Sequence, residues 1–228
     1  MAASLREHSE NGDRGFTLVE LLVATVVSML VLGGAVALTS QVQTGYRRQV
    51  EDAAAQQEGR YALEWIGKLI RGAGNQPFPL ALDSNCPTAA WEFEAVRFDP
   101  DGDTIDNDIR LQTDSNPPDG LYGGTAGACT QANEDVTISL DTVNDAILFL
   151  DNNLGGGSSI RTDAVIEDLR FIYRDGNHQT AAESGVAMTE ANVRYVETQI
   201  TVRSRTLDPA GQPVTRTISS EVRIRSRQ

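Results

Sequence analysis

Gly15-Phe16-Thr17-Leu18-Val19-Glu20 opens an apolar run that continues to Leu38. From Phe16 to Leu38 there are 23 residues, and the only charged one is Glu20. Because an α-helix rises about 1.5 Å per residue, a helix of this length would reach about 35 Å. That is enough to cross a hydrocarbon core about 30 Å thick. The sequence therefore predicts a membrane-spanning helix over residues 16–38.

The residues before Phe16 are not typical of a secretory signal peptide. They carry Arg6 and Arg14 together with three acidic residues, and they lack an apolar core and a small-residue cleavage box. We therefore treat residues 1–15 as a leader that takes no part in the fold. Arginines flank the span on both sides, since Arg47-Arg48 follows it, so charge does not determine its orientation.

Glu20 is unusual in a membrane span. A carboxylate at mid-bilayer costs about 2.5–3.5 kcal/mol, and less near the end of a helix. One interpretation is that Glu20, which lies near one end, reaches the headgroup region as an ionised side chain. The other is that it is buried and paired with a positive group, because a buried carboxylate is tolerated only when paired.

The hexapeptide from Gly15 to Glu20 resembles the signal of type IV prepilins, which reads glycine, phenylalanine, threonine, leucine, a hydrophobic residue and glutamate. The resemblance implies that a prepilin peptidase cleaves between Gly15 and Phe16 and N-methylates Phe16. It also implies that Glu20 pairs with the N-terminal amine of a neighbouring subunit during assembly. The implied partners are this peptidase, other minor and major pilins or pseudopilins, and the inner membrane, with the C-terminal domain periplasmic or extracellular.

The helical pattern continues beyond the span as an amphipathic stripe. No proline occurs between Phe16 and Gln76, so nothing forces a break. Gly72 and Gly74 then supply a helix stop. We expect one helix of about 55 residues, with an amphipathic half over residues 39–74. The expected stripe has spacings of three and four and comprises Val42, Tyr46, Val50, Ala53, Gln57, Tyr61, Trp65 and Leu69, broadened near its end by Leu63, Ile66 and Ile70.

After residue 90 the hydrophobic period changes to two, which indicates strands. The expected strands are Trp91–Phe98, Ile109–Gln112, Asp135–Leu140, Ala146–Leu150, Val165–Tyr173, Val193–Arg205 and Val214–Arg225. The last two are long and nearly adjacent, so they should form an antiparallel hairpin. We predict an α+β fold of the pilin type, in which the long N-terminal helix packs on an antiparallel β-sheet in a β-rich domain over residues 75–228.

Four segments, at residues 61–74, 166–175, 194–200 and 218–227, resemble minor pilins of the PilW type. The J-type pseudopilins of type II secretion are similar at the helix end. Residues 75–160 show little resemblance to either group. The function implied is a minor pilin that is incorporated in, or primes, a type IV pilus. The alternatives are a type II secretion pseudopilin and a membrane-anchored calcium-binding or adhesin module that never polymerises.

The charge distribution and the cysteines limit the possible partners. The formal net charge is -13, and the region from Asp83 to Asp151 has fifteen acidic residues against Arg97 and Arg110. We therefore expect no nucleic-acid partner, although an arginine-rich C-terminal face leaves DNA uptake as a weaker alternative. Cys86 and Cys129 form one disulfide if the compartment is oxidising, and otherwise are two reduced, buried thiols.

Five carboxylates fall within ten residues of the acidic middle region, at Asp99, Asp101, Asp103, Asp106 and Asp108. Calcium prefers six to eight oxygen ligands, so this loop is a candidate calcium site. The spacing is not that of an EF-hand, and a solvated acidic turn is the alternative. We expect no required cofactor. Because no nucleophile–histidine pair or P-loop lysine is present, we predict a protein that is not an enzyme.

Overall fold

The computed structural model describes residues 15–75, 95–114, 132–154, 157–208 and 210–224. Both cysteines of the expected disulfide, Cys86 and Cys129, lie outside these residues, so the disulfide stays a prediction. The chain divides into two compact units, Met1–Arg47 and Arg48–Gln228. A single helix, α1 (Leu18–Gly72, 55 residues), contributes to both units, as the proline-free pattern predicts.

Helix α1 ends at the predicted glycines. The amide of Ala73 donates to the carbonyl of Leu69 at 3.0 Å, and Gly74 has a φ of +70°. A left-handed residue after the last helical turn is a common helix stop, and glycine adopts this conformation without strain. The amide of Gly74 then donates to the carbonyl of Gln112 at 2.7 Å, which ties the end of the helix to a strand.

The strands form two antiparallel sheets in place of the single sheet expected from the sequence. One sheet has the order β1-β2-β3-β4-β5, and the other has the order β6-β7-β8. The strands are β1 (Val96–Phe98), β2 (Asp108–Gln112), β3 (Asp135–Asp141), β4 (Ala146–Asp151), β5 (Ser159–Ile160), β6 (Ile166–Arg174), β7 (Tyr195–Leu207) and β8 (Pro213–Arg223). The predicted hairpin of the last two strands is confirmed as β7 and β8.

Strands β2, β3, β4, β6, β7 and β8 lie within two residues of their predicted bounds. Two short elements were not predicted: strand β5 and helix α2 (Ala181–Ser184). Both are too short to show a hydrophobic period. Helix α2 is held by a capping box, in which Thr180 accepts a hydrogen bond from the amide of Glu183 and the Glu183 carboxylate accepts one from the amide of Thr180.

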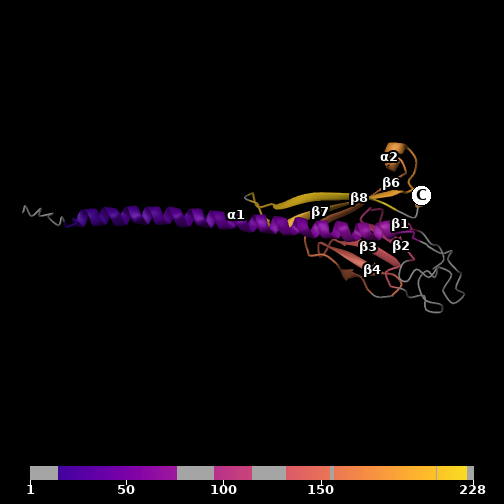
Figure 1. Cartoon of the computed structure of the whole chain (residues 1–228), viewed down its shortest axis with the longest axis horizontal. Coiled ribbons are helices and arrows are strands. Elements are labelled where there is room, and N and C mark those ends of the chain that lie inside the picture. The colour runs from indigo at the N-terminus through magenta and orange to yellow at the C-terminus, as the bar shows by residue number, and fades with distance from the viewer. Residues whose placement is uncertain (1–14, 76–94, 115–131, 155–156, 209, 225–228) are drawn as a thin grey trace, which may run out of the picture. The chain divides into compact units, whose positions relative to one another are not determined.

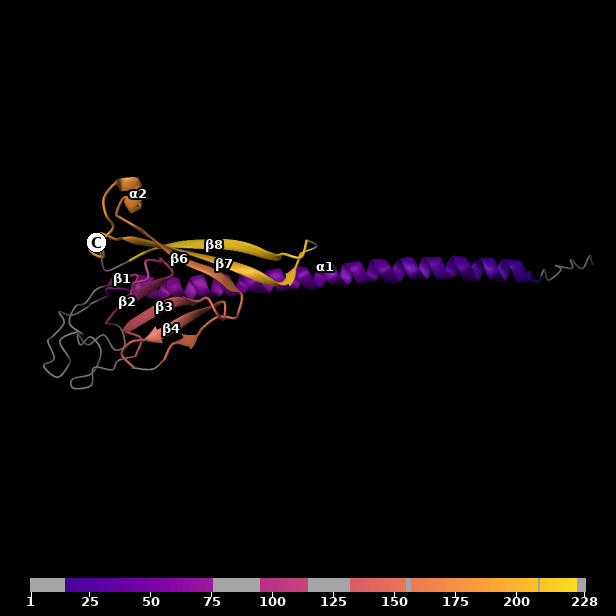
Figure 2. The same ribbon diagram turned by 180° about the vertical axis from the view of Figure 1, so that it is seen from behind.

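The C-terminal part of α1 lies between the two sheets (Figures 1 and 2). On one side it approaches Val202 of β7 and Ile218 of β8, and on the other the rings of Trp65 and Phe149 of β4 meet edge to face at 6.4 Å. The sheets also contact each other, since Phe98 of β1 stacks on Tyr173 of β6 at 3.9 Å. Because the helix has apolar residues on more than one side here, two sheets rather than one are needed to cover it.

The buried face of α1 differs from the predicted stripe. Leu63, Ile66 and Ile70 are buried as expected, but the side chains of Ala53, Gln57 and Tyr61 are exposed. The rest of the buried face consists of small residues, namely Ala55, Gly59, Ala62 and Gly67. The predicted stripe was wrong upstream of Leu63 because it favoured larger residues, whereas helix and strands approach closely only where side chains are small.

A charged cluster stabilises one end of the β6-β7-β8 sheet. The Arg174 guanidinium donates to Glu197 at 2.7 Å, and it lies 3.4 Å from Glu183 and 3.3 Å from Glu221. His178 contacts the other carboxylate oxygen of Glu221 at 2.8 Å. The hydrogen bond from Arg174, followed by one from a glutamine, lowers the pKa of Glu197. Both side chains of the central pair are mostly buried, at 20% and 15% exposed, so solvent screens it only partly.

We predict that Gly59→Ala destabilises the protein. The new Cβ would lie 2.7 Å from Val202 Cγ1 and Ile218 Cδ1. Such overpacking costs about 1–3 kcal/mol, which exceeds the gain in helix propensity of about 1 kcal/mol. Urea unfolding of the full-length protein in detergent micelles measures the change. The control is Gly72→Ala, where nothing lies within 4 Å, and which should not lower stability. An unchanged or raised stability of Gly59→Ala would contradict this packing.

We also predict a pH-dependent contribution from Glu197. Its pKa is lowered in the folded state, whereas in the unfolded chain it is about 4.3. The stabilisation is therefore complete above about pH 4.3 and is lost as the pH falls through the folded-state pKa. Glu197→Gln should lower the free energy of unfolding by about 1–2 kcal/mol at pH 7. The difference from the wild type should shrink toward zero at pH 3.

Urea unfolding at several pH values between 7 and 3 provides the measurement. The control is Glu64→Gln, since Glu64 and Lys68 form a surface pair with side chains 68% and 66% exposed. Such pairs contribute little, so this variant should stay within about 0.5 kcal/mol of the wild type throughout. A Glu197→Gln effect that persists undiminished at pH 3 would rule out the charge as its cause.

Candidate functional site

The first candidate site is the N-terminal end of α1. Gly15, Phe16 and Thr17 precede the helix and are exposed, with Phe16 86% exposed. The amide and the hydroxyl of Thr17 both donate to Glu20 Oε2 at 3.0 Å, and the amide of Glu20 donates to Thr17 Oγ1 at 3.2 Å. These three bonds form a capping box that satisfies two otherwise unpaired amides.

The capping box assigns Glu20 a role within its own chain. Its carboxylate accepts from Thr17 and lies at the positive end of the helix dipole, which favours a negative charge. The box uses only atoms of Thr17 and Glu20, so cleavage before Phe16 would leave it intact. The Gly15–Phe16 peptide bond lies outside regular structure, where a protease has access to it.

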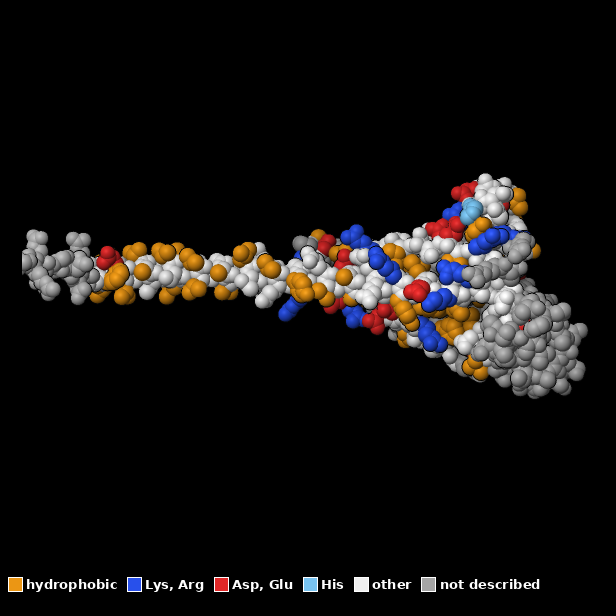
Figure 3. Space-filling model, in the orientation of Figure 1, with side chains coloured by type: hydrophobic (Ala, Val, Ile, Leu, Met, Phe, Trp, Pro, Cys, Tyr) orange, Lys and Arg blue, Asp and Glu red, His pale blue; other side chains and the backbone are white. Residues whose placement is uncertain are grey.

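The helix that follows exposes apolar side chains on every face. All described residues from Gly15 to Thr44 are exposed, and the large hydrophobic ones among them are 49–86% exposed. Figure 3 shows apolar side chains on both edges of this part of α1. Among the described residues, α1 is the one helix long and apolar enough to cross a membrane. An apolar surface of this extent requires lipid or other apolar helices around it.

A comparison with known protein families matches this same N-terminal segment. A family model described as the prokaryotic N-terminal methylation motif matches residues 11–36. This motif and the long apolar helix fit a type IV prepilin-like protein. The matched segment of this prepilin-like protein includes Gly15, Phe16 and Glu20, and it continues into the apolar half of α1. Neither the curated proteins nor the solved structures include a significant match to the chain.

The second candidate site of the prepilin-like protein is the acidic loop between β1 and β2. Asp99, Asp101 and Asp108 each place a carboxylate oxygen within 4.8 Å of the other two. Asp103 and Asp106, which the sequence analysis also predicted as ligands, are not part of this group. Asp103 Oδ1 accepts from the amide of Ile105 at 2.7 Å, and the carbonyl of Asp106 accepts from the amide of Phe171.

Asp99 organises the loop. Its two carboxylate oxygens accept hydrogen bonds from three backbone amides at 2.9–3.0 Å, those of Gly102, Asp103 and Thr104. Asp99 itself has a φ of +42°, in the left-handed region that aspartate tolerates better than most residues. The loop therefore turns tightly around one carboxylate, and this turn brings Asp101 back toward Asp108.

Asp108 is the most unusual residue of the loop. It begins β2, is 1% exposed, and accepts a hydrogen bond from the amide of Asp101 at 3.3 Å through Oδ2. Its Oδ1 is buried and has no hydrogen-bond partner within the described part of the chain. Burial, followed by the charge of Asp101, raises the pKa of Asp108 to about 7. The sequence alone did not distinguish Asp108 from the other four aspartates.

The arginine-rich face, which was the weaker alternative for DNA binding, is partly neutralised. Arg203 forms an ion pair with Asp145, and Arg205 lies 3.7 Å from Asp163. Arg225, a further arginine of the C-terminal segment, lies outside the described residues. Paired arginines have less capacity to neutralise phosphates. The absence of a nucleic-acid partner stays a prediction.

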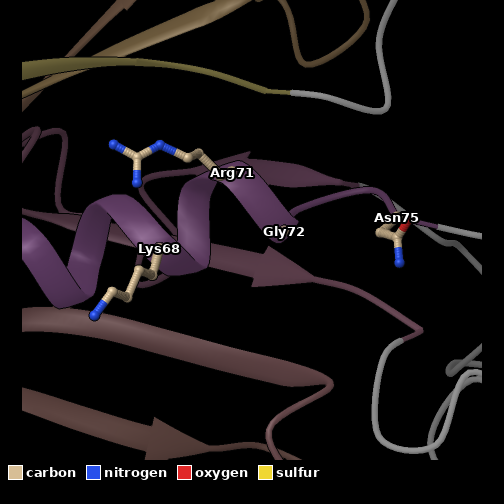
Figure 4. A pocket seen from close by; sticks show the side chains of 4 residues that line it. All are labelled: Lys68, Arg71, Gly72 and Asn75. Carbon is tan, nitrogen blue, oxygen red and sulfur yellow. The ribbon is translucent and has the colours of Figure 1, made fainter.

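A cavity of about 370 Å³ at the end of α1 is lined by Lys68, Arg71, Gly72 and Asn75. Figure 4 shows the side chains of Lys68 and Arg71 pointing away from each other, and Asn75 lies apart from both. Lys68 is also paired with Glu64 at 2.9 Å. The described side chains that line this cavity do not converge on a common point.

We predict that Thr17→Val loosens the first turn of α1. The substitution removes a hydroxyl that both donates to and accepts from Glu20, and the loss of a cap costs about 0.5–2 kcal/mol. The amides of the first turn should then exchange about two- to thirty-fold faster in deuterated buffer. Hydrogen exchange of the full-length protein in micelles, followed by NMR, is the measurement.

The control is Thr39→Val, because the Thr39 hydroxyl donates to the carbonyl of Ala35 within the helix and caps nothing. It should leave exchange of the first turn unchanged. Equal exchange rates in Thr17→Val and the wild type would show that the capping box does not hold the helix start.

Proposed function

We propose that the chain is a minor pilin of the PilW type, which is processed by a prepilin peptidase and then incorporated in, or primes, a type IV pilus. One observation supports this most strongly. An exposed Gly15–Phe16 bond precedes a helix that is apolar on every face and carries one acid, Glu20, in its first turn. The match to the N-terminal methylation motif lies on the same residues.

The geometry suggests how the proposed subunit is stored and assembled. Before assembly, the apolar half of α1 crosses the inner membrane once, and the β-rich domain lies on the periplasmic or extracellular side. In the filament, the same apolar surface packs against helices of other pilins in place of lipid. This exchange removes Glu20 from the headgroup region, so its charge needs a partner, which the methylated amine of Phe16 in a neighbouring subunit would supply.

The segments that resemble PilW-type pilins are close together in the fold, which supports the choice within the pilin class. Residues 166–175, 194–200 and 218–227 contribute to β6, β7 and β8, which form one sheet. The fourth segment, residues 61–74, is the part of α1 that packs in the same unit. The resemblance therefore follows a continuous piece of structure, the helix end with one sheet, rather than scattered fragments.

Processing is the first test of this proposal. Mass spectrometry of the protein purified from cell membranes should find a mature N-terminus at Phe16 that carries one methyl group. Gly15→Val should yield the uncut chain, because the peptidase would no longer meet glycine before the scissile bond. Gly45→Val, at a helical glycine with no neighbour within 4 Å, should be processed normally. An uncut wild-type chain would instead support the membrane-anchored module.

Assembly is examined in the same cells. Glu20→Ala should be processed and retained in the membrane but lost from sheared filaments, whereas a protein that never polymerises would be unaffected. Cross-linking of the wild-type protein followed by mass spectrometry identifies its neighbours. Pilus subunits among them support the minor pilin, and secretion pseudopilins would overturn that assignment in favour of the J-type alternative.

A further inference from the structure

The acidic loop presents an electrostatic problem that the described residues do not solve. Asp108 is 1% exposed, and while its Oδ2 accepts from the amide of Asp101, its Oδ1 has no hydrogen-bond partner among the described residues. A buried carboxylate is normally paired with a positive group or fully hydrogen-bonded. Within the described part of the chain, no lysine or arginine is paired with Asp99, Asp101 or Asp108. The nearest charged oxygens are those of two more aspartates.

We propose that Asp99, Asp101 and Asp108 bind a calcium ion. The three carboxylate oxygens lie within 4.8 Å of one another, so one cation can reach all of them. Asp108 supplies the buried side of this group, and the exposed Asp101 leaves the outer side open to water ligands. Three carboxylates with water suit calcium, which accepts six to eight oxygens in flexible geometry.

The composition of the site disfavours other metals. Its grouped side chains are all carboxylates, with no histidine or cysteine among them, whereas zinc and copper favour nitrogen and sulfur ligands. Magnesium requires near-ideal octahedral geometry at short distances. The loop holds Asp99 in a tight turn and Asp108 at the start of a strand, so it has little freedom to adjust to that geometry.

A cavity gives the cation access to the site. It has a volume of about 370 Å³, and Asp101 and Asp108 lie in its wall. The same wall includes hydroxyl and amide side chains from β3 and the turn after β4, at Thr137, Ser139 and Asn152. These side chains are neutral. Arg110 also lines the cavity, and its guanidinium is paired with Asp135.

The loop joins β1 to β2 within one sheet and contacts β6 of the other, so the proposed ion has a structural consequence. Phe98, immediately before Asp99, stacks on Tyr173 of β6, and the Asp106 carbonyl accepts from the amide of Phe171 of β6. Among the described residues, the buried hydroxyl of Tyr173 also has no hydrogen-bond partner. Burial raises the pKa of Tyr173, and the charges of Asp106, Asp108 and Asp99 add to this effect. Calcium at the loop would therefore stabilise the junction between β1-β2 and β6.

The test is a calcium titration of the full-length protein in detergent micelles after treatment with EDTA. With a dissociation constant of about 0.1–1 mM, which is typical of extracellular calcium modules, 10 mM calcium chloride should raise the melting temperature by roughly 3–10 °C. Magnesium chloride at the same concentration should raise it by less than half as much. Isothermal titration calorimetry gives the dissociation constant directly.

Two variants test which residues bind the calcium ion. Asp101→Asn removes the charge of an exposed ligand while keeping an oxygen to accept from the amide of Asp103, so it should fold and bind calcium at least ten-fold more weakly. Asp108→Asn should also lose the response to calcium. The matched control is Asp106→Asn, an aspartate of the same loop outside the three-oxygen group, which should keep wild-type affinity.

Three results would overturn the proposal. The first is a wild-type melting temperature that does not change at 10 mM calcium. The second is an affinity lowered as much by Asp106→Asn as by Asp101→Asn, which would indicate diffuse attraction to an acidic surface. The third is an equal response to magnesium. The calcium titration measures neither processing nor assembly. Its result therefore does not bear on the proposed pilin function, which is tested by the processing and assembly experiments.

Discussion

The close approach of α1 to β7 and β8 is the constraint on which the described part of the second unit depends. At Gly59 there is no space for even one more carbon atom beside Val202 and Ile218. This contact requires small residues on one face of the helix, and it places Leu63, Ile66 and Ile70 where both sheets cover them. The two small sheets thereby share one hydrophobic core with the helix that lies between them.

The same helix meets opposite requirements at its two ends. Around Gly59 its buried face must be small so that strands can approach, while between Leu18 and Leu38 its apolar side chains are exposed on every side. One continuous run of backbone hydrogen bonds joins the two parts, and no proline interrupts it. A prepilin-like protein thus carries its membrane segment and the centre of its folded domain on a single element.

Charge is placed in two contrasting ways in the second unit. In the Arg174 cluster, three carboxylates surround one guanidinium, so each partly buried acid has a positive neighbour. In the loop before β2, three carboxylates come together, and no described lysine or arginine forms an ion pair with any of them. The first arrangement places a positive group beside every one of its acids. The second brings acids together without a positive partner among the described residues, which is the basis of the calcium proposal.

The sequence by itself determined the long helix, its glycine stop, most strand bounds and the prepilin-like N-terminus. Each rests on local patterns, since hydrophobic period and turn residues act over a few neighbours. Only the tertiary structure decided that two sheets form, that Ala55 and Gly59 rather than Tyr61 face the core, and that Asp108 alone among five aspartates is buried. These outcomes depend on which segments far apart in the sequence pack together, and a pattern of neighbouring residues does not contain that information.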